Sequence, residues 1–221
     1  APYSLGIDKI APLLGEFHMR HPEVRVEMIL SNEPLDMIAG EIDVALRMGP
    51  LPDSSFVARR LGTLHTQVYA GSAYIERYGE PLHPDELQYH RTLAMPKHRH
   101  GQGYAWSLDD GNGRQQFPIN PILVVNDPAA LKGALLCGEG LVIGADVMVK
   151  TAVEHGAVRR VLAGWSGGDY QFNAVFPRGH GQSPKVRAFV DFLLERLNLE
   201  IDYMSEHCPL MAGSCGGAAQ A

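Results

Sequence analysis

A serine flanked by glycines is the first feature of the sequence that could carry out a reaction. Gly164-Trp165-Ser166-Gly167-Gly168 matches the Gly-x-Ser-x-Gly pattern, which in hydrolases exposes a nucleophilic serine on a sharp turn from a strand to a helix. The segment 158–162 predicts the strand before it, but 170–176 predicts another strand after it. Because no helix start is available to stabilise an oxyanion, we interpret the motif as a glycine-rich turn and expect no catalytic residue.

Polar residues at expected helix starts form the second feature, and their chemistry is anion binding. Unpaired N–H groups and the helix dipole attract negative charge there, and open α/β sheets bind ligands outside the carboxyl ends of their strands. Pro2-Tyr3-Ser4, Ser31-Asn32 and Asn126-Asp127 all hold such positions. Simple helix capping is the competing role, and for Asn126 and Asp127 both alternatives stay open.

The histidines do not show the spacing of a metal site. His98-Arg99-His100 has His83 and His90 nearby, but an arginine intervenes, and no carboxylate or cysteine pair lies close in the sequence. We therefore expect residues 97–103 to form a solvated surface loop. The sequence predicts no metal ion and no cofactor.

The elements that must position these residues begin with an α/β arrangement. Asp8 is placed to cap a helix that has Pro12 in its first turn and ends near Arg20. Val24–Leu30 alternates apolar and polar residues, which predicts a strand. A short helix after this strand and a buried strand over 42–46 complete a parallel strand-helix-strand unit.

The rest of the chain predicts further alternation around one hairpin. The turn residues Asp109 to Gly113 suit positive φ angles. Ser183 as cap and Pro184 at the first position open the clearest amphipathic helix, which is expected to bury Val186, Phe189, Val190, Leu193 and Leu194. The other expected elements are strands at 56–61, 66–70, 92–95, 104–108, 114–117, 122–125, 141–143, 158–162 and 170–176, and helices at 72–78, 128–136 and 146–155, with a helical turn near residue 85.

Composition indicates a globular chain with no general attraction for nucleic acid. Of 221 residues 45% are apolar, and 25 acidic against 19 basic residues give a net charge of −6, whose field repels phosphate. We find no secretory leader and no apolar run long enough to span a bilayer. Three cysteines without repeated spacing favour the reducing cytoplasm. The Gly- and Ala-rich residues 205–221 predict a flexible tail.

Six ordered segments resemble the effector-binding region of LysR-type transcriptional regulators. They lie within residues 1–197. No single motif is diagnostic, but an unrelated sequence would rarely contain all six in the same order. The segments are Ile10-Ala11-Pro12-Leu13-Leu14-Gly15-Glu16-Phe17, His21-Pro22-Glu23-Val24-Arg25-Val26-Glu27, Ile42-Asp43-Val44-Ala45-Leu46-Arg47-Met48-Gly49, Leu51-Pro52-Asp53-Ser54-Ser55, Val57-Ala58-Arg59-Arg60-Leu61-Gly62 and Lys185-Val186-Arg187-Ala188-Phe189-Val190-Asp191-Phe192-Leu193.

The resemblance implies a two-lobed α/β fold of the periplasmic-binding-protein-like type 2 class, with two crossover strands and an effector in the cleft between the lobes. Lobe I is expected at 1–70 plus 175–204 and lobe II at 71–174, with crossings at 66–70 and 170–176. Family members also carry an N-terminal winged helix-turn-helix and a first central strand before the segment matching Ala1-Pro2, which this sequence does not include. The expected function is effector sensing, with DNA bound only through that N-terminal domain and no membrane partner.

The expected effector is a small anion, and we favour a carboxylate. Ser4, Ser31 and Asn126 would donate hydrogen bonds to it, each charge-assisted, and Arg47 would add a bidentate grip if its side chain turns inward. Tyr3 and Met48 would supply an apolar wall. The complete set of expected effector-binding residues is Tyr3, Ser4, Ser31, Asn32, Arg47, Met48, Asn126 and Asp127.

The resemblance further implies a side-by-side, antiparallel homodimer, with a tetramer open to the full-length protein. Segments 10–20 and 24–29 would meet 122–125 and 128–136 of the second copy, and Val124, Leu131 and Leu135 would extend one apolar face across the contact. Two other functions stay open as alternatives. A secreted solute receptor would share the fold but need a signal peptide, and a serine hydrolase would lose its activity in Ser166→Ala.

Overall fold

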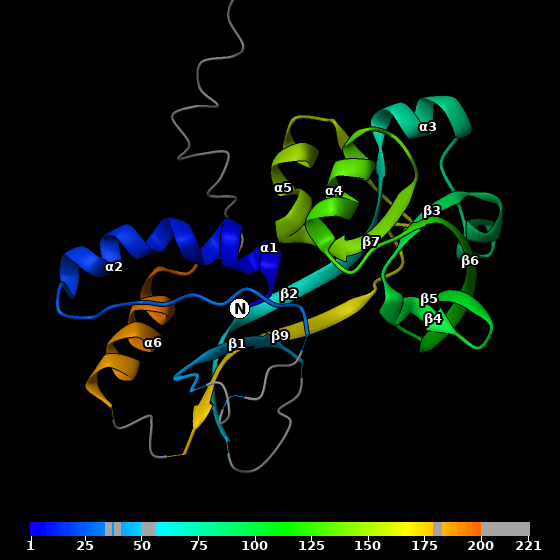
Figure 1. Ribbon diagram of the computed structural model, residues 1–221. Coiled ribbons are helices and arrows are strands. Elements are labelled where there is room, and N and C mark those ends of the chain that lie inside the picture. Colours follow the sequence, from blue (N-terminus) through cyan, green and yellow to red (C-terminus); the bar gives the residue numbers. More distant parts are fainter. Residues whose placement is uncertain (34–36, 38–40, 50–55, 179–182, 200–221) are drawn as a thin grey trace, which may run out of the picture.

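A nine-stranded sheet runs through the molecule, and two long strands cross between two groups of elements (Figure 1). The computed structural model describes residues 1–33, 37, 41–49, 56–178 and 183–199. The crossing strands are β2 (Phe56–Gly71) and β9 (Gly168–Pro177), which pair antiparallel. The strand order is β1-β9-β2-β7-β3-β6-β5-β4, and β8 pairs with β2 off this path.

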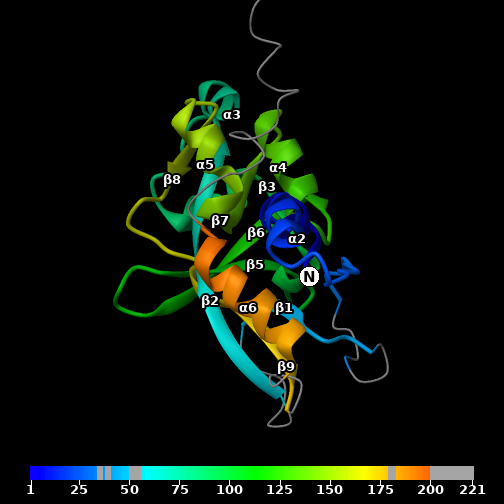
Figure 2. The same ribbon diagram turned by 90° about the vertical axis from the view of Figure 1, so that its left-hand side faces the viewer.

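The strands expected at 56–61 and 66–70 are one continuous strand of 16 residues. The register to β9 shifts between Arg60 and Gly62, so a bulge interrupts the alternation without ending the pairing. Pairing continues from Phe56 opposite Pro177 to Thr66 opposite Gly168. The sequence therefore predicted the crossings at the correct places but made them too short. Figure 2 shows β2 running the length of the molecule beside β9.

The first helix begins at Tyr3, earlier than expected. α1 (Tyr3–Leu5), the π-helical η1 (Gly6–Ile10), the 3₁₀-helical η2 (Ala11–Leu13) and α2 (Leu14–Arg20) follow one another without a break. Pro12 has no N–H group to donate to a preceding carbonyl, and the hydrogen-bond spacing changes around it instead of starting there. The expected cap at Asp8 is wrong, whereas the expected end near Arg20 is correct.

Residues 22–31 follow an extended path but do not form the expected strand. Val24, Val26 and Met28 are half-buried against the core, while Arg25 and Glu27 are exposed, so the alternation predicted the two faces correctly. No described strand lies beside the segment to complete a ladder of hydrogen bonds. The expected strand over 24–30 is therefore wrong as a strand, although its orientation is correct.

The next strand pairs differently from the prediction. β1 (Ala45–Met48) begins later than the expected 42–46 and pairs antiparallel with β9, with Ala45 opposite Val175. A parallel strand-helix-strand unit in the first third is therefore not formed, because β1 pairs with β9 alone among the described strands and residues 24–30 form no ladder with it. The short helix expected after Asn32 lies outside the described residues except for Met37, which is buried in a turn.

The second group of elements contains the predicted hairpin. β5 (Gly103–Asp109) and β6 (Arg114–Val124) form it, and the far half of β6 pairs in parallel with β3 (Arg91–Ala94). The strand expected separately at 122–125 is therefore the end of β6. The remaining elements are α3 (Ser72–Tyr78), η3 (Pro84–Tyr89), η4 (Pro96–His98), β4 (Arg99–His100), α4 (Pro128–Leu136), β7 (Leu141–Ala145), α5 (Asp146–Glu154) and β8 (Val158–Val161).

Buried side chains fall into separate cores on either side of the crossing. Phe17, Phe172 and Leu193 belong to the core formed by helix 3–20, β9 and α6 (Pro184–Arg196), and we call this part lobe I. Trp106 and Leu135 belong to two cores among the elements α3 to β8, which we call lobe II. Two lobes joined by a shared pair of strands are the fold that the sequence predicted.

The last helix differs from its prediction in two details. Phe192 is buried in α6, while Leu194, expected inside, is 40% exposed. Ser183 precedes the helix but its side chain makes no capping hydrogen bond, and Pro184 occupies the first turn as expected. The sequence pattern placed the helix correctly, because one wide apolar stripe is sufficient to orient it.

Candidate functional site between the lobes

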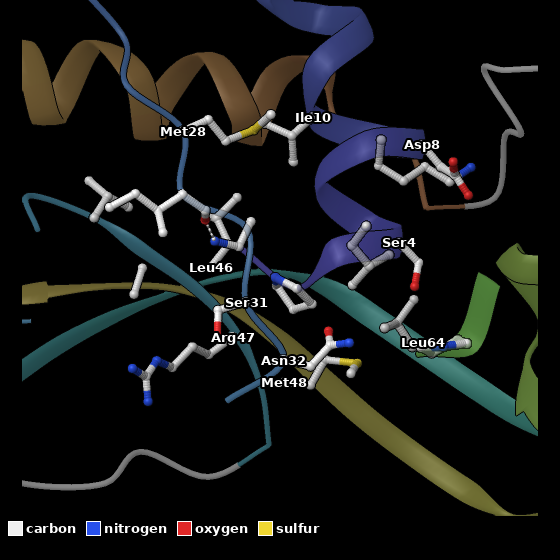
Figure 3. A pocket seen from close by; sticks show the side chains of 18 of the residues that line it. Ser4, Asp8, Ile10, Met28, Ser31, Asn32, Leu46, Arg47, Met48 and Leu64 are labelled. Atoms are coloured by element: carbon white, nitrogen blue, oxygen red, sulfur yellow. Dashed lines mark hydrogen bonds between the residues drawn. The ribbon is translucent and has the colours of Figure 1, made fainter. Parts of the chain in front are cut away.

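A cavity of about 770 Å³ lies between the two lobes and continues into lobe I. This volume is in the range that holds small molecules in proteins. Figure 3 shows Asn32 and Met48 close together at one end of it and Ile10 with Met28 at the other. The residues that line the interlobe part include Ser4, Ser31, Asn32 and Met48 of lobe I, Met95, Lys97, His98, Leu131 and Ile143 of lobe II, and Thr66 and Tyr170 of the crossing strands.

Two serines expected at the site line the cavity. Ser4 stands in the first turn of α1, where backbone N–H groups have no partner within the helix. Ser31 exchanges two hydrogen bonds with Glu33: its hydroxyl donates to the carbonyl (3.2 Å) and accepts from the N–H (3.1 Å). The hydroxyl of Ser31 therefore fixes a tight turn at the end of the extended segment, beside the cavity.

Arg47 and Met48, at the end of β1, also line the cavity. Figure 3 shows the Arg47 side chain extending away from Ser4 and Asn32. Burial and, secondarily, the charge of Arg47 lower the pKa of the Ala1 ammonium group. This ammonium group donates to the Ile29 carbonyl (2.9 Å). Arg47 is thus one of several cationic residues of lobe I at the cavity, and its guanidinium does not point toward the two serines.

The other four expected residues form an interlobe contact. The Asn32 amide donates to the Asn126 carbonyl (3.0 Å) and to an Asp127 carboxylate oxygen (2.9 Å), and its own oxygen accepts from the Tyr3 N–H (3.1 Å). The second Asp127 oxygen accepts from the Ala129 N–H (2.8 Å) and so caps α4. Tyr3, Asn126 and Asp127 do not themselves line the cavity; they hold Asn32, which does.

Lys97 and His98 are cavity residues that the sequence reasoning missed. They belong to η4, directly after β3, and not to the solvated loop expected at 97–103; Arg99 and His100 form β4. The expected exposure is correct for these residues except His98, which is half-buried and packs against Trp106; the segment is wrong as an irregular loop, because it forms a 3₁₀ turn and a short strand. The carboxyl-end rule that selected Ser31 and Asn126 applies equally to the residues after β3, and it would have found them.

The electrostatics of this lobe II wall are set by desolvation. Burial, with a smaller effect of the Lys97 charge, lowers the pKa of His98 to about 4, so the ring is neutral at pH 7. Its Nδ1 accepts from the Met95 N–H (3.1 Å), which leaves the proton on Nε2. Lys97 is exposed as a whole residue, yet crowding by the cleft walls lowers the pKa of its ammonium group. That ammonium lies 5.5 Å from the centre of the Tyr170 ring.

Ser166 sits in a turn without the support that a nucleophile needs. β8 precedes the motif and β9 begins at Gly168, as the sequence predicted. The Ser166 hydroxyl accepts from the Gly168 N–H (3.0 Å) and donates to the Thr66 carbonyl (3.4 Å). These bonds give the serine a structural role in joining the turn to the crossing strand.

The histidines considered as metal ligands occupy different places. His83 packs edge-on against Trp165, and His90 contacts Tyr74 through a 3.0 Å hydrogen bond. Within the described ranges no three His, Cys, Asp or Glu side chains come together in a group that could hold a metal ion. In the same part of the chain, no helix has the length and apolar character needed to cross a membrane.

Two lobes, two crossing strands and a cavity between them define a ligand-binding domain of the periplasmic-binding-protein-like class. The family model described as the LysR substrate binding domain matches residues 1–198, and the chain belongs to that family. It is 61% identical over 99% of its length to an HTH-type transcriptional regulator of Xanthomonas campestris pv. campestris. It spans 65% of that relative's length. The chain is thus a LysR substrate-binding domain.

Solved structures support the same fold. The regulatory domain of CrgA, a LysR-type transcriptional regulator from Neisseria meningitidis, superposes with a TM-score of 0.78 at 29% identity, covering 89% of this chain and 96% of that one. The full-length virulence activator AphB of Vibrio cholerae gives a TM-score of 0.77 at 26% identity, covering 88% of this chain and 66% of that one. The family of regulators does not favour the alternatives of a solute receptor or a hydrolase.

Proposed function

We propose that a small carboxylate binds in the interlobe cavity and changes the relation of the lobes, which alters DNA binding by the full-length regulator. The observation that carries the proposal is one cavity lined by polar groups of both lobes, with Asn32 bonded across it. A ligand that contacts both lobes stabilises one arrangement over another by its differential affinity. DNA is bound by the N-terminal domain of the full-length regulator. The ligand-binding domain itself works in the cytoplasm and has no catalytic activity.

The carboxylate is favoured by donors and by one lysine. Ser4 lines the cavity from lobe I, while Lys97 and the Nε2–H of His98 are available from lobe II. Met48, Met95 and Leu131 supply an apolar wall, which suits an aromatic or branched body. Local donors must outweigh the net charge of −6, which disfavours anions at long range.

A screen of ligand pairs tests the proposal. Carboxylates and neutral amides of the same shape are compared by thermal unfolding, since a ligand at about 100 times its Kd adds roughly 2.7 kcal/mol of stability. We expect stabilisation by carboxylates alone, weakened in the Ser4→Ala, Ser31→Ala double variant. Ser72→Ala is the control, because this hydroxyl bonds to the Gly156 carbonyl outside the cavity. Stabilisation by neutral or cationic compounds only would contradict the proposal.

A homodimer is the second part of the proposal. Met19 and Ile29 on lobe I and Ile122 and Leu136 on lobe II are large apolar side chains that are 44–78% exposed. Pairing of β6 with β5 ends at Ile119, so residues 120–124 have a free outer edge among the described strands. Leu131 and Leu135, expected in the contact, are instead buried in a lobe II core. Val124 stays available at 38% exposure.

We also propose where an added strand fits and where the lobes divide. The part of the cavity inside lobe I lies between the extended segment 24–29 and β1 and is lined by Val26, Met28 and Leu46. A strand preceding Ala1 in the full-length regulator would find partners on both sides there. For the lobes, Leu64 and Phe172 pack in the lobe I core and Val68 in a lobe II core. This favours a division near Thr66 and Tyr170, a few residues from the expected 70/71 and 174/175.

A further inference from the structure

A second, smaller cavity lies beside the interlobe cavity and shares one wall with it. Its volume is about 200 Å³, below the range of pockets that enclose drug-sized ligands but sufficient for an ion or a head group. Lys97, His98, Ile143 and Tyr170 line both cavities. We call the smaller one the basic chamber; it is also lined by Arg99, His100, Ala105, Ser107, Gln116 and Gly167.

The charged groups of the basic chamber have one sign. Lys97 and Arg99 are cationic, His98 and His100 are imidazoles, and no residue that lines the chamber is a carboxylate. Lys97 forms no ion pair with any described residue, and its ammonium group lies over the Tyr170 ring. Arg99 donates to the Tyr104 hydroxyl (3.2 Å) and stacks over that ring. An uncompensated ammonium group in a cleft is a site where an anion is favoured, because crowding disfavours the isolated charge.

Polar groups and close packing form the opposite wall. Ser107 and Gln116 are cross-strand neighbours on β5 and β6. The Ser107 hydroxyl is buried and has no hydrogen-bond partner within the described part of the chain. Behind them Gly167 is packed so closely that a Cβ there would lie 2.5 Å from Thr66 Oγ1 and 2.6 Å from Ile143 Cδ1. The wall is thus fixed in place, and its hydroxyl and amide groups are uncharged donors.

We propose that the basic chamber binds a compact oxyanion, with Lys97 as its counter-charge and Ser107 and Gln116 as hydrogen-bond donors. The oxyanion is either a free ion or the charged end of a ligand whose body lies in the interlobe cavity across the Lys97–Tyr170 wall. This site shares Lys97 with the proposed carboxylate site but lies on the other side of it from Ser4 and Ser31, so variants of those two serines separate the two sites.

Titration of the 221-residue chain with inorganic phosphate tests the inference. Ionic strength is held constant with sodium chloride, because screening alone changes surface electrostatics. Calorimetry is expected to give saturable binding, weakened about tenfold or more in Lys97→Met, since a charge-assisted hydrogen bond is lost. Lys150→Met is the matched control, because Lys150 is on the α5 surface 4.0 Å from Glu154 and lines neither cavity. Absence of saturable binding, or equal weakening in both variants, would overturn the inference.

Three further measurements keep the test independent of variant folding and of the interlobe site, and identify the kind of anion. In the unmodified chain, phosphate should shift the amide resonances of Ser107 and Gly167, and shifts confined to other residues would contradict the assignment. The Ser4→Ala, Ser31→Ala variant should bind phosphate as the unmodified chain does. If it binds phosphate more weakly, the oxyanion lies on the lobe I side, which overturns the chamber but leaves the proposed function standing. Tighter binding of ethyl phosphate than of phosphate identifies a head group, and equal binding a free ion; both results support the chamber.

Discussion

The Asn32 amide of lobe I donates a 2.9 Å hydrogen bond to the Asp127 carboxylate of lobe II. A second bond from the same amide reaches the Asn126 carbonyl at 3.0 Å. Both partners directly precede α4, and Asp127 keeps its other oxygen for the cap. Asn32 therefore connects the lobes directly across the cleft. This connection is separate from the two crossing strands β2 and β9.

Removal of this connection should loosen the closed arrangement. We expect Asn32→Ala to lower the free energy of unfolding by roughly 1–3 kcal/mol, because three hydrogen bonds are lost: two that its amide donates, one of them to a charged group, and one that its oxygen accepts from the Tyr3 N–H. The α4 cap stays intact, since it uses only Asp127. Small-angle scattering should give a larger radius of gyration. Asn112→Ala, which removes a contact to Asp110 in the exposed hairpin turn, is the control and should leave the radius unchanged.

His98 should make the domain sensitive to acid. Its folded pKa of about 4 lies below the usual 6.5, mainly through burial. The unfolded chain therefore binds a proton between these values while the folded chain does not, so stability is lost as pH falls from about 6.5 toward 4. The loss should be at most about 3 kcal/mol from this residue. His98→Asn, which can still accept from the Met95 N–H, should flatten the pH dependence of the melting temperature in this range.

Gly71 and Gly15 should respond oppositely to alanine. A Cβ on Gly71 would lie 2.5 Å from the Leu135 carbonyl oxygen, whereas a Cβ on Gly15 meets nothing within 4 Å. We expect Gly71→Ala to cost roughly 1–3 kcal/mol, as overpacking does. Gly15→Ala lies in a helix, where alanine is favoured over glycine, and should raise the free energy of unfolding by as much as about 1 kcal/mol. Denaturant unfolding measures both, and a neutral Gly71→Ala would contradict the close approach of β2 to the end of α4.

The free edge of β6 provides a test of the dimer. We expect Ile122→Glu to weaken self-association about tenfold or more. A symmetric contact contains the same residue from both copies, so the substitution buries two charges in it. Leu82→Glu is the control, since Leu82 is 82% exposed before η3 and lies outside the segments expected in the contact. Sedimentation equilibrium at tens of micromolar measures the change. If the unmodified chain is a monomer, or if both substitutions weaken self-association equally, this contact is wrong.

Local patterns predicted most elements of the fold but not their partners. The alternation at Val24, Val26 and Met28 predicted the buried face correctly, yet whether the segment joins a sheet depends on a neighbouring strand. Likewise, Pro12 correctly indicated a helix but not where it begins. The helical stretch accommodates this proline in its interior by changing from π-helical to 3₁₀-helical hydrogen-bond spacing. Long-range pairing of β1 with β9 joins residues 130 positions apart, such as Ala45 and Val175, and no local pattern contains it.

The candidate site was predicted in the same partial way. The rule that ligands bind at strand and helix ends found Ser4, Ser31 and Asn32 from sequence alone, and all three line the cavity. Lys97 was missed because a run of basic and polar residues resembles a solvated loop, and only the packing of Tyr170 against it shows otherwise. The contact of Asn32 with Asp127 joins residues 95 positions apart, so it required the folded structure.

The pairing of β2 with β9 from Phe56 to Thr66 has a consequence for how the domain loses its structure. Each of these strands carries residues of the lobe I core at one end, and β2 carries residues of the lobe II cores at the other. If one lobe melts, the ladder that holds the other frays with it, because neither lobe has a crossing strand of its own. The two-lobed domain should therefore unfold as one cooperative unit, and every spectroscopic signal should show the same single transition.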